Sequence, residues 1–419
     1  MSILIKNATI VTQNKTRDII STGFIIIKKT RIIKIKGDNP DPSDLRGINK
    51  IIDAKGLIVF PGFINAHVHL GESIFQKILK SNLEDYLSIT DKISQKADFI
   101  EKKRDIIADY SILNLLRSGT TTICGGRTID QSNIWGIRNV SGYMIMNNFK
   151  LSILSLNLEK KYKKEYKKIK NTRNAYPAIF IHSINNFDLK ILPEVKKILK
   201  KYPDSKLILH LAETKKQEKE VKEKFNLSSV EFLEKHNLLN KNTILIHCNW
   251  VNTKDLSLIK KNETSIVQCL SSSINVADRV LDLSKVLKKN IKTCLATDGL
   301  PTSNTFSVLD EAEKCFGYYK KKRKIIDRQK CLDLITIEAA RVLGLENDIG
   351  SIEINKKADI IFVKAEDINL PNNNYCISGA IIDGNIKMWN GKALKVNEQK
   401  IIADFNKLSN KIAKNEYLY

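Results

Sequence analysis

The sequence predicts an α/β protein in which a (β/α)8 TIM barrel carries a small β-sandwich formed by the N- and C-terminal segments. Three observations support this fold class. Short β-rich runs occur at both ends of the chain, strand-like apolar runs alternate with helical stretches between them, and histidines recur where those runs end. Of the 419 residues, 42% are hydrophobic, which is ordinary for a globular protein and excludes a disordered or fibrous chain.

The terminal segments show the pattern of short strands separated by turns. Apolar, β-branched runs occur throughout the first 60 residues and return near the C-terminus. We therefore expect both segments to contribute to one β-rich unit. The expected strands are 3–5, 10–12, 23–27, 32–35, 51–52 and 57–60 at the start, and 359–363, 377–382 and 386–389 at the end.

The central region alternates strand-like runs with helical stretches such as Leu192–Lys201 and Leu227–Leu239. The runs are almost continuously apolar, as parallel strands covered on both faces require. Eight such runs separated by helices predict a βα barrel. For the third strand the sequence leaves two alternatives. The expected strands are 64–68, 121–124, 143–146 or instead 151–156, 178–181, 207–211, 243–246, 265–269 and 293–296.

These patterns divide the chain into three parts. A chain of 419 residues has room for two to three domains of ordinary size. We expect residues 1–60 to form the N-terminal part of the sandwich and residues 61–345 to form the barrel. Residues 346–419 are expected to form the C-terminal part of the sandwich and a tail.

The chain carries a formal net charge of +24, from 70 lysines and arginines against 46 acidic residues. A basic excess can indicate nucleic-acid binding. Here the excess is mostly lysine and is spread along the whole chain with many isoleucines and asparagines, which is typical of a genome-wide codon bias. The densest run, Lys160–Lys170, is interleaved with tyrosine and glutamate and predicts a solvated helix face. We therefore expect no nucleic-acid partner.

The sequence also lacks the features of a membrane or secreted protein. It has no run of about 18 consecutive apolar residues, and residues 1–15 contain no continuous apolar block of a secretory signal. Its seven cysteines are scattered and include no C-x-x-C pair, which fits neither a disulfide framework nor a zinc knuckle. We therefore expect no membrane association and a cytoplasmic location.

Five of the six histidines lie at or just beyond the C-terminal end of an expected barrel strand. In βα barrels this end of the strands carries the chemistry, whereas the opposite end serves stability. A lone histidine in such a place is more often a packed core residue, but five at one end of a barrel favour a functional site. The five are His67 and His69 after the first strand, His182 after the fourth, His210 after the fifth and His247 after the sixth.

The H-V-H spacing of His67 and His69 places both imidazoles on one side of a strand, because side chains alternate with a period of two. Asp298 follows the eighth strand, and Glu213 comes three residues after His210. Two imidazoles, a third from another strand and one carboxylate suit a divalent metal such as zinc, with an open position for water. We expect Glu213 on the loop above the barrel, beside that metal.

Four motifs in this order resemble the amidohydrolase superfamily: Pro61–His69 (PGFINAHVH), Leu209–Glu213 (LHLAE), Leu245–His247 (LIH) and Ala296–Asn304 (ATDGLPTSN). The segment Leu343–Asp359 is similar to the return of that family into its small β-sandwich. Within the superfamily the chain resembles the branch of cytosine deaminase, guanine deaminase, S-adenosylhomocysteine/methylthioadenosine deaminase and the triazine hydrolases. The resemblance spans nearly the whole chain.

The resemblance implies one divalent metal ion per chain, Zn²⁺ or else Fe²⁺. It also implies that Glu213 moves protons and that His247 positions or polarises the attacking water. Dinuclear relatives use a carboxylated lysine at the end of the fourth strand, where this chain has residues 180–183 (FIHS), so a mononuclear site is implied. The implied metal ligands come from three strands: His67, His69, His210 and Asp298.

Two departures from the family pattern leave the substrate open. Residues 268–273 read QCLSSS where nucleoside deaminases often have H-C-P-x-S-N, and residues 70–73 read LGES, unlike adenosine-type or guanine-type enzymes. Both segments lie where substrate is normally bound. The candidates for substrate contacts, each with a surface or packing role as an alternative, are Glu72, Gln76, Arg127 and His182.

The sequence thus predicts a metal-dependent hydrolase, and specifically a hydrolytic deaminase that releases ammonia from an aminated N-heterocycle or its nucleoside. The alternative is that the same site cleaves another C–N or C–halide bond, in a cyclic amide, an amidine or a chlorotriazine-like compound. A catalytically idle binding protein is disfavoured because all six implied catalytic groups are present. The expected partner is a small molecule, and the resemblance also allows a homo-oligomer.

Overall fold

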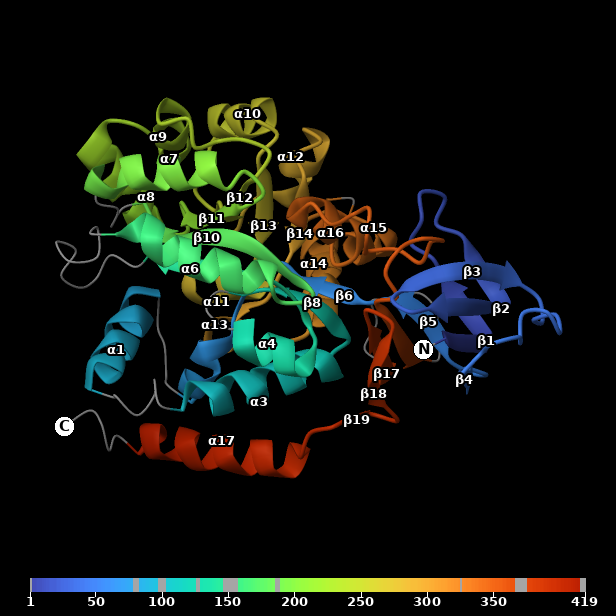
Figure 1. The fold of residues 1–419 in the computed structure, drawn as a ribbon. Helices are drawn as coiled ribbons and strands as arrows, with labels where there is room; N and C mark the ends of the chain where they lie inside the picture. The colour runs from blue at the N-terminus through green and yellow to red at the C-terminus, as the bar shows by residue number, and fades with distance from the viewer. Residues whose placement is uncertain are drawn as a thin grey trace.

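Within the part of the chain that the computed structural model describes, eight parallel strands form a nearly closed barrel with helices around it (Figure 1). This part comprises residues 2–77, 83–96, 103–125, 129–145, 157–184, 189–324, 326–365 and 375–414. Neighbouring strands of the barrel follow one another along the chain, as a (β/α)8 fold requires, so the predicted fold class is confirmed. The strands are β6 (Phe63–Asn65), β8 (Thr120–Cys124), β9 (Arg138–Ile145), β10 (Ala175–Ser183), β11 (Lys206–Leu211), β12 (Thr243–His247), β13 (Ser265–Gln268) and β14 (Thr293–Leu295).

The third strand differs most from its prediction. The alternative 143–146 overlaps the end of β9, but that strand already begins at Arg138. Its first residues are polar and still buried, which an apolar pattern cannot reveal. The other alternative, 151–156, lies outside the described residues.

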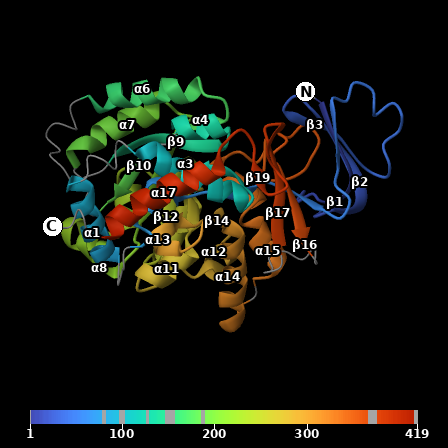
Figure 2. The ribbon, with the colours of Figure 1, turned by 90° about the horizontal axis from the view of Figure 1, so that it is seen from below.

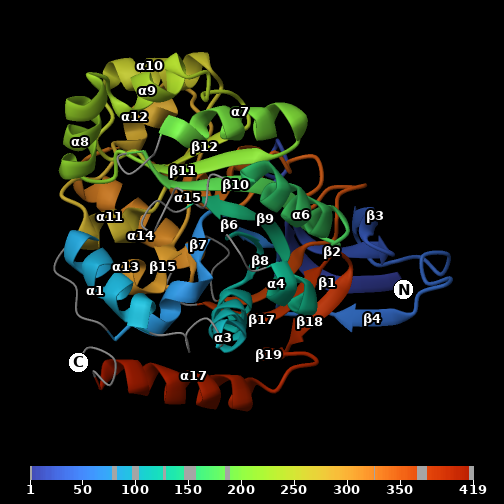
Figure 3. The same ribbon diagram turned by 60° about the vertical axis from the view of Figure 1, so that its left-hand side comes forward.

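The barrel closes through short continuations of its first and last strands. Among the described strands, β6 and β14 do not pair directly, but β7 (Val68–His69) pairs in parallel with β15 (Asp298–Gly299) (Figure 3). The backbone N–H of Asp298 donates to the carbonyl oxygen of His67 at 3.0 Å. This seam places Asp298 next to His67, and both are predicted metal ligands.

Several helices begin at polar caps. Ser228 and Asn252 form capping boxes at the starts of α9 and α10. The lysine-rich run forms α6, as predicted, with Tyr162 and Ile169 buried and most of its lysines exposed. No helix in the described residues is both long and apolar enough to cross a lipid bilayer. The helices are η1 (Leu70–Phe75), α1 (Leu83–Lys96), α3 (Arg104–Arg117), α4 (Ile129–Trp135), α6 (Leu158–Lys170), η2 (Leu189–Ile191), α7 (Leu192–Lys201), α8 (Lys215–Phe225), α9 (Ser229–Lys235), α10 (Thr253–Lys261), α11 (Leu270–Val276), α12 (Leu283–Lys288), α13 (Leu300–Ser303), α14 (Val308–Lys321), α15 (Arg328–Asp333), α16 (Ile337–Leu343) and α17 (Glu398–Ala413).

Strands from both ends of the chain share a second, mostly antiparallel sheet beside the barrel (Figure 2). Its order is β19-β18-β17-β16-β5-β1-β2-β3, with β4 paired to β1. The N- and C-terminal parts join where β5 pairs with β16, Pro61 lying opposite Ile360. The strands are β1 (Ser2–Val11), β2 (Ile19–Lys28), β3 (Arg31–Gly37), β4 (Lys50–Asp53), β5 (Ile58–Pro61), β16 (Ile360–Ala365), β17 (Tyr375–Ile382), β18 (Asn385–Trp389) and β19 (Lys392–Ala393).

The C-terminal helix returns from this sheet to the barrel. In Figures 1 and 2, α17 lies along α3, and the ring of Phe405 stacks on Tyr110 with 3.6 Å between the ring centres. Leu408 and Ile412 are buried in the same cluster with Phe75 of η1. The segment predicted as a tail therefore includes a helix that supports the loop after the first barrel strand.

A buried ion pair connects the barrel to the second sheet. Arg138, which is 1% exposed, donates from Nε and Nη2 to the two carboxylate oxygens of Asp359 at 2.8 and 3.0 Å. The backbone N–H of Asp383 donates to the same carboxylate at 2.7 Å. A bidentate pair of this kind is strongly directional, so it sets the orientation of the sheet against the barrel.

Replacing Arg138 tests this connection. Arg138→Met leaves the carboxylate of Asp359 buried without its cation, and breaking one side of a buried pair costs about 3–5 kcal/mol. We expect the free energy of unfolding in urea to fall by that amount. Lys168→Met removes an exposed pair with Asp130 and is the control, with an expected change below about 1 kcal/mol. Equal losses in the two variants would contradict the role given to Arg138.

Candidate metal centre

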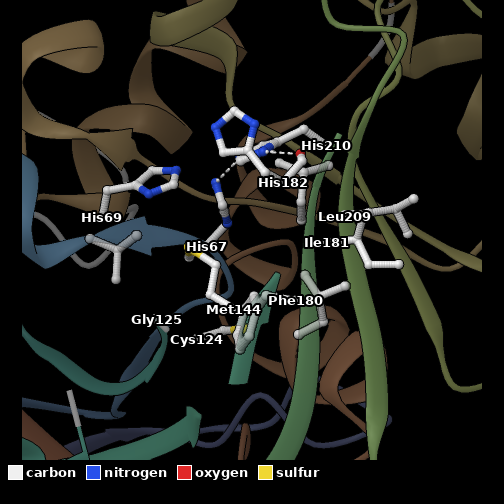
Figure 4. Close-up of a pocket in the computed structure, with 13 residues that line it drawn as sticks. His67, His69, Cys124, Gly125, Met144, Phe180, Ile181, His182, Leu209 and His210 are labelled. Carbon is white, nitrogen blue, oxygen red and sulfur yellow. Dashed lines mark hydrogen bonds between the residues drawn. The ribbon is translucent and has the colours of Figure 1, made fainter. Parts of the chain in front are cut away.

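The C-terminal ends of the barrel strands bring imidazoles together above the apolar barrel interior, and Figure 4 shows those of His67, His69, His182 and His210. His67 lies just before β7 and His69 at its end, and His210 lies on β11. Asp298 opens β15 and faces them across the seam of the barrel. His247, the last residue of β12, lies beside His210, with 5.3 Å between the ring centres.

Four side chains place one ligand atom each within 4.8 Å of all the others: His67, His69, His210 and Asp298. Nε2 of His67 and Nε2 of His69 lie 3.2 and 3.1 Å from Oδ1 of Asp298. Nε2 of His210 lies 3.1 Å from Nε2 of His67. Imidazole nitrogens and a carboxylate oxygen are the donors that catalytic zinc sites use.

The protonation of His210 shows why these atoms fit a metal ion. Its Nδ1 lies 2.7 Å from the backbone carbonyl oxygen of His182, and a carbonyl only accepts, so Nδ1 carries the proton. Burial and the neighbouring imidazoles hold the pKa of His210 well below its usual value, so the ring is neutral and Nε2 presents a lone pair. That lone pair faces Nε2 of His67 among the converging ligand atoms, and a neutral imidazole nitrogen of this kind can bind a metal ion.

Buried carboxylates also make the place where the four ligand atoms converge favourable for a positive charge. Burial by itself lowers the pKa of His69, but the charges of Glu72 and Asp298 raise it to about 9. Burial opposes ionisation of Asp298, yet its contacts with His67 and His69 hold its pKa well below the usual range. The cluster therefore stabilises a positive charge where the ligand atoms converge.

The backbone at the site is held in an unusual conformation. Asp298 and His247 have φ angles of +69° and +70°, in the left-handed region that residues with a β-carbon seldom adopt. Oδ2 of Asp298 accepts hydrogen bonds from the hydroxyl groups of Ser272 at 2.6 Å and Thr302 at 3.1 Å. These contacts leave Oδ1 facing the imidazoles.

Glu213 and His247 form a second cluster that shares Asp298 with the first. Oε1 of Glu213 lies 3.4 Å from Nε2 of His247. Burial, followed by the charge of Asp298, raises the pKa of Glu213 to about 8, so its carboxyl group holds a proton near neutral pH. Burial lowers the pKa of His247 to about 4, so its ring is neutral.

Glu72, predicted as a substrate contact, lies against a metal-ligand candidate. Its Oε1 lies 3.3 Å from Nδ1 of His69, and its Oε2 accepts a hydrogen bond from the hydroxyl of Tyr86 at 3.1 Å. A carboxylate on the far nitrogen of a metal-binding histidine fixes the ring orientation. Gly299 leaves the space for this carboxylate, since a β-carbon there would collide with Oε2 of Glu72.

Of the other three predicted substrate contacts, the two that the structure describes, His182 and Gln76, line separate cavities. His182 lines a small cavity with Met144 and Phe180, next to the imidazoles of the site (Figure 4). Burial lowers the pKa of His182 to about 4, so its ring is neutral. Gln76 is exposed and lines a separate cavity between α3 and the start of α14. Arg127 lies outside the described residues.

Three side chains at the site escaped prediction: Ser272, Thr302 and Tyr86. Ser272 belongs to the QCLSSS run, whose only signal was three polar residues directly after an apolar strand. Gln268, at the position of the family histidine, points elsewhere and donates to the carbonyl oxygen of Leu281 at 2.9 Å. Tyr86 lies on α1, whose position over the barrel follows from tertiary packing.

The barrel and its site match one family model. The model of the amidohydrolase family covers residues 58–387, which is most of the chain. The chain therefore belongs to the amidohydrolase family, and the resemblance found in the motifs is confirmed. It is a hydrolase that acts on C–N bonds.

Individual relatives match over nearly the full length. The chain is 26% identical to a 5-methylthioadenosine/S-adenosylhomocysteine deaminase of Clostridium tetani, over 99% of this chain and 100% of the relative. It is 27% identical to a 5′-deoxyadenosine deaminase of Methanobrevibacter smithii, over 96% of this chain and 95% of the relative. A solved adenosine deaminase of Xanthomonas campestris with bound zinc superposes with a TM-score of 0.88 at 17% identity, covering 98% of both chains. An atrazine chlorohydrolase of Arthrobacter aurescens in complex with zinc gives 0.84 at 17% identity, covering 97% of this chain and all of the other.

Gly299→Ala tests whether Glu72 orients His69. The added β-carbon displaces the Glu72 carboxylate, and loss of such an outer partner costs roughly 10–100-fold in metal affinity. We expect zinc affinity, measured by chelator competition, to weaken by about that factor. Gly317→Ala on α14 is the control, because its β-carbon meets nothing within 4 Å and zinc affinity should not change. Unchanged affinity in Gly299→Ala would contradict the role of Glu72.

Proposed function

We propose that the protein is a metal-dependent deaminase that releases ammonia from an adenosine-type nucleoside. The observation that carries the proposal is the convergence of His67, His69, His210 and Asp298 beside the buried carboxyl group of Glu213. The relatives named above support the substrate class, because they are deaminases of adenosine derivatives that align with this chain from end to end.

The metal ion is proposed to be a single Zn²⁺. Its ligands would be Nε2 of His67, His69 and His210 together with Oδ1 of Asp298, the atoms that converge in the site. The bound zinc of the Xanthomonas campestris structure supports zinc over iron. When bound, such an ion supplies Lewis acidity that lowers the pKa of water to about 7.

Glu213 is proposed to deliver the proton that deamination needs. Its carboxyl group is buried and protonated near neutral pH, so it can donate to a ring nitrogen of the heterocycle. Protonation there lets the attacked carbon become tetrahedral without a buried anion. The proton that Asp298 has taken from the attacking water then passes to the departing amine, and Glu213 regains its own proton from the hydroxyl group on the tetrahedral carbon as the product carbonyl forms. Each assisted transfer contributes roughly 10²–10⁴-fold to the rate.

His247 and Asp298 are proposed to act on the attacking water. His247 is neutral and buried with Nε2 beside Glu213, so it can orient the nucleophile without adding charge to the site. Asp298 stays ionised and accepts the proton of the water. Its hydroxyl contacts with Ser272 and Thr302 hold the carboxylate in one orientation for that step.

A second candidate keeps the site and changes the leaving group. The atrazine chlorohydrolase shares this fold, and the strand-seven histidine of nucleoside deaminases is replaced by Gln268, whose amide points away from the site. The same activated water would then displace another amine or a halide. Product mass distinguishes this outcome from deamination.

The cellular setting is also a proposal. All seven cysteines are free and six of them are buried, which supports a reducing compartment such as the cytoplasm. The partner we propose is the small-molecule substrate. A homo-oligomer stays a prediction from the family resemblance.

Glu213→Gln separates proton transfer from metal binding. The amide cannot donate the carboxyl proton, so we expect kcat to fall by about 10²–10⁴-fold. Zinc affinity should stay unchanged because Glu213 is outside the ligand set. Glu223→Gln, at an exposed carboxylate on α8, is the matched control and should keep full activity. Full activity in Glu213→Gln would contradict the proton role.

Ammonia release tests the function itself. Zinc-loaded protein is incubated with adenosine, 5′-deoxyadenosine, methylthioadenosine and their free bases, with Asp298→Asn as the blank. We expect ammonia from at least one nucleoside, loss of release on chelation and recovery with added zinc. If one zinc binds per chain and no compound releases ammonia, the deaminase proposal is wrong and product masses from other leaving groups become the next measurement.

A further inference from the structure

Helix α11 follows the seventh barrel strand and carries three consecutive buried serines, Ser271, Ser272 and Ser273. Serine is a poor residue for a helix interior because its hydroxyl competes for backbone groups. Three in a row therefore need partners outside the helix. Successive residues of an α-helix point about 100° apart, so the three hydroxyls face three different neighbours.

Two of these serines contact the site. The hydroxyl of Ser272 donates to Oδ2 of Asp298 at 2.6 Å. The hydroxyl of Ser273 donates to the side-chain oxygen of Asn249 at 3.1 Å, and Nδ2 of Asn249 donates to the backbone carbonyl oxygen of Glu213 at 3.1 Å. One short helix thus reaches both the proposed ligand carboxylate and the segment that carries the proposed proton donor.

The third serine connects α11 to α14. The residue before the helix, Cys269, provides no side-chain cap for its first turn. The carboxylate of Glu311 caps the first turn in its place. Its Oε2 accepts a hydrogen bond from the backbone N–H of Ser271 at 3.0 Å. Lys314, one turn further along α14, donates to the hydroxyl of Ser271 at 2.8 Å. A carboxylate at a helix start satisfies a free N–H and is favoured by the helix dipole.

The hydrogen bonds of Glu311 in the described residues go to Ser271, and the charge of Lys314 lies nearby. The side chain of Glu311 is fully buried, and its second oxygen, Oε1, has no hydrogen-bond partner there. A fully buried carboxylate with one oxygen left unpartnered is costly. Its position therefore indicates a function in holding α11 rather than in general stability.

We propose that Glu311 is a positioning residue of the metal centre, which fixes α11 so that Ser272 holds Asp298 in its ligand orientation. This inference rests on the proposed metal site. It assigns no contact with substrate or metal to Glu311 itself, which acts through the helix.

Zinc affinity of Glu311 variants tests the inference. Glu311→Met removes the acceptor with little change in size, and Glu311→Asp keeps the charge but shortens the side chain so that it no longer reaches Ser271. We expect both to weaken zinc binding by about 10–100-fold, as loss of an outer partner of a metal ligand does. Glu311→Gln keeps an acceptor oxygen at the same length and should recover most of the affinity.

Two further variants separate positioning from a structural effect. Ser272→Ala should weaken zinc binding by a similar factor, and the double variant Glu311→Met/Ser272→Ala should be no weaker than either single variant, because both remove the same contact. Asp310→Asn is the matched control. It changes the neighbouring residue of α14, whose carboxylate accepts hydrogen bonds from the hydroxyl groups of Thr305 and Tyr375. Zinc affinity should stay unchanged.

The absorption spectrum of Co²⁺-loaded protein gives a readout independent of activity, since it reports the ligand geometry. We expect it to change in Glu311→Met and Ser272→Ala but not in Asp310→Asn. A folded Glu311→Met or Glu311→Asp chain with wild-type zinc affinity and spectrum overturns the inference. If wild-type protein binds neither metal ion, the proposed function fails as well, which distinguishes the two failures.

Discussion

The carboxylate of Asp298 is the group on which the closure of the barrel and the chemistry of the site both depend. Its backbone N–H pairs the eighth strand with the first, and its Oδ1 faces the imidazoles of His67 and His69 on the first strand. Its Oδ2 is held from the seventh strand by Ser272. A carboxylate so constrained cannot relax around an approaching ion, and this rigidity is what a selective metal site requires.

Buried polar groups are paired at one end of the barrel and converge on a common point at the other. At the N-terminal end, Arg138 and Asp359 satisfy each other in a bidentate pair that attaches the second sheet. At the C-terminal end, Nε2 of His67 lies 3.1 Å from Nε2 of His210 and 3.2 Å from Oδ1 of Asp298, so candidate ligand atoms crowd together. A satisfied pair contributes stability, whereas converging ligand atoms indicate a place for a cation.

The family fold accommodates different chemistries because the barrel supplies positions and the loops supply selectivity. Here the loop after the first strand places Glu72 in contact with His69. The same loop contacts α1 through Tyr86 and packs against α17. The loop after the seventh strand forms α11. These two loops are also the places where the sequence departs from the nucleoside deaminases, so they are where substrate selectivity would have changed.

The sequence by itself determined the barrel, the second sheet and the residues at the C-terminal ends of the barrel strands. It could do so because strand periodicity and the H-V-H spacing are local properties. It could not place the start of β9, since Arg138 is buried only through a partner more than 200 residues away. Nor could it show that Glu72 contacts His69, or that Ser272 and Glu311 support Asp298. Those contacts join residues far apart in the chain, and only the closed barrel brings their side chains within hydrogen-bond distance.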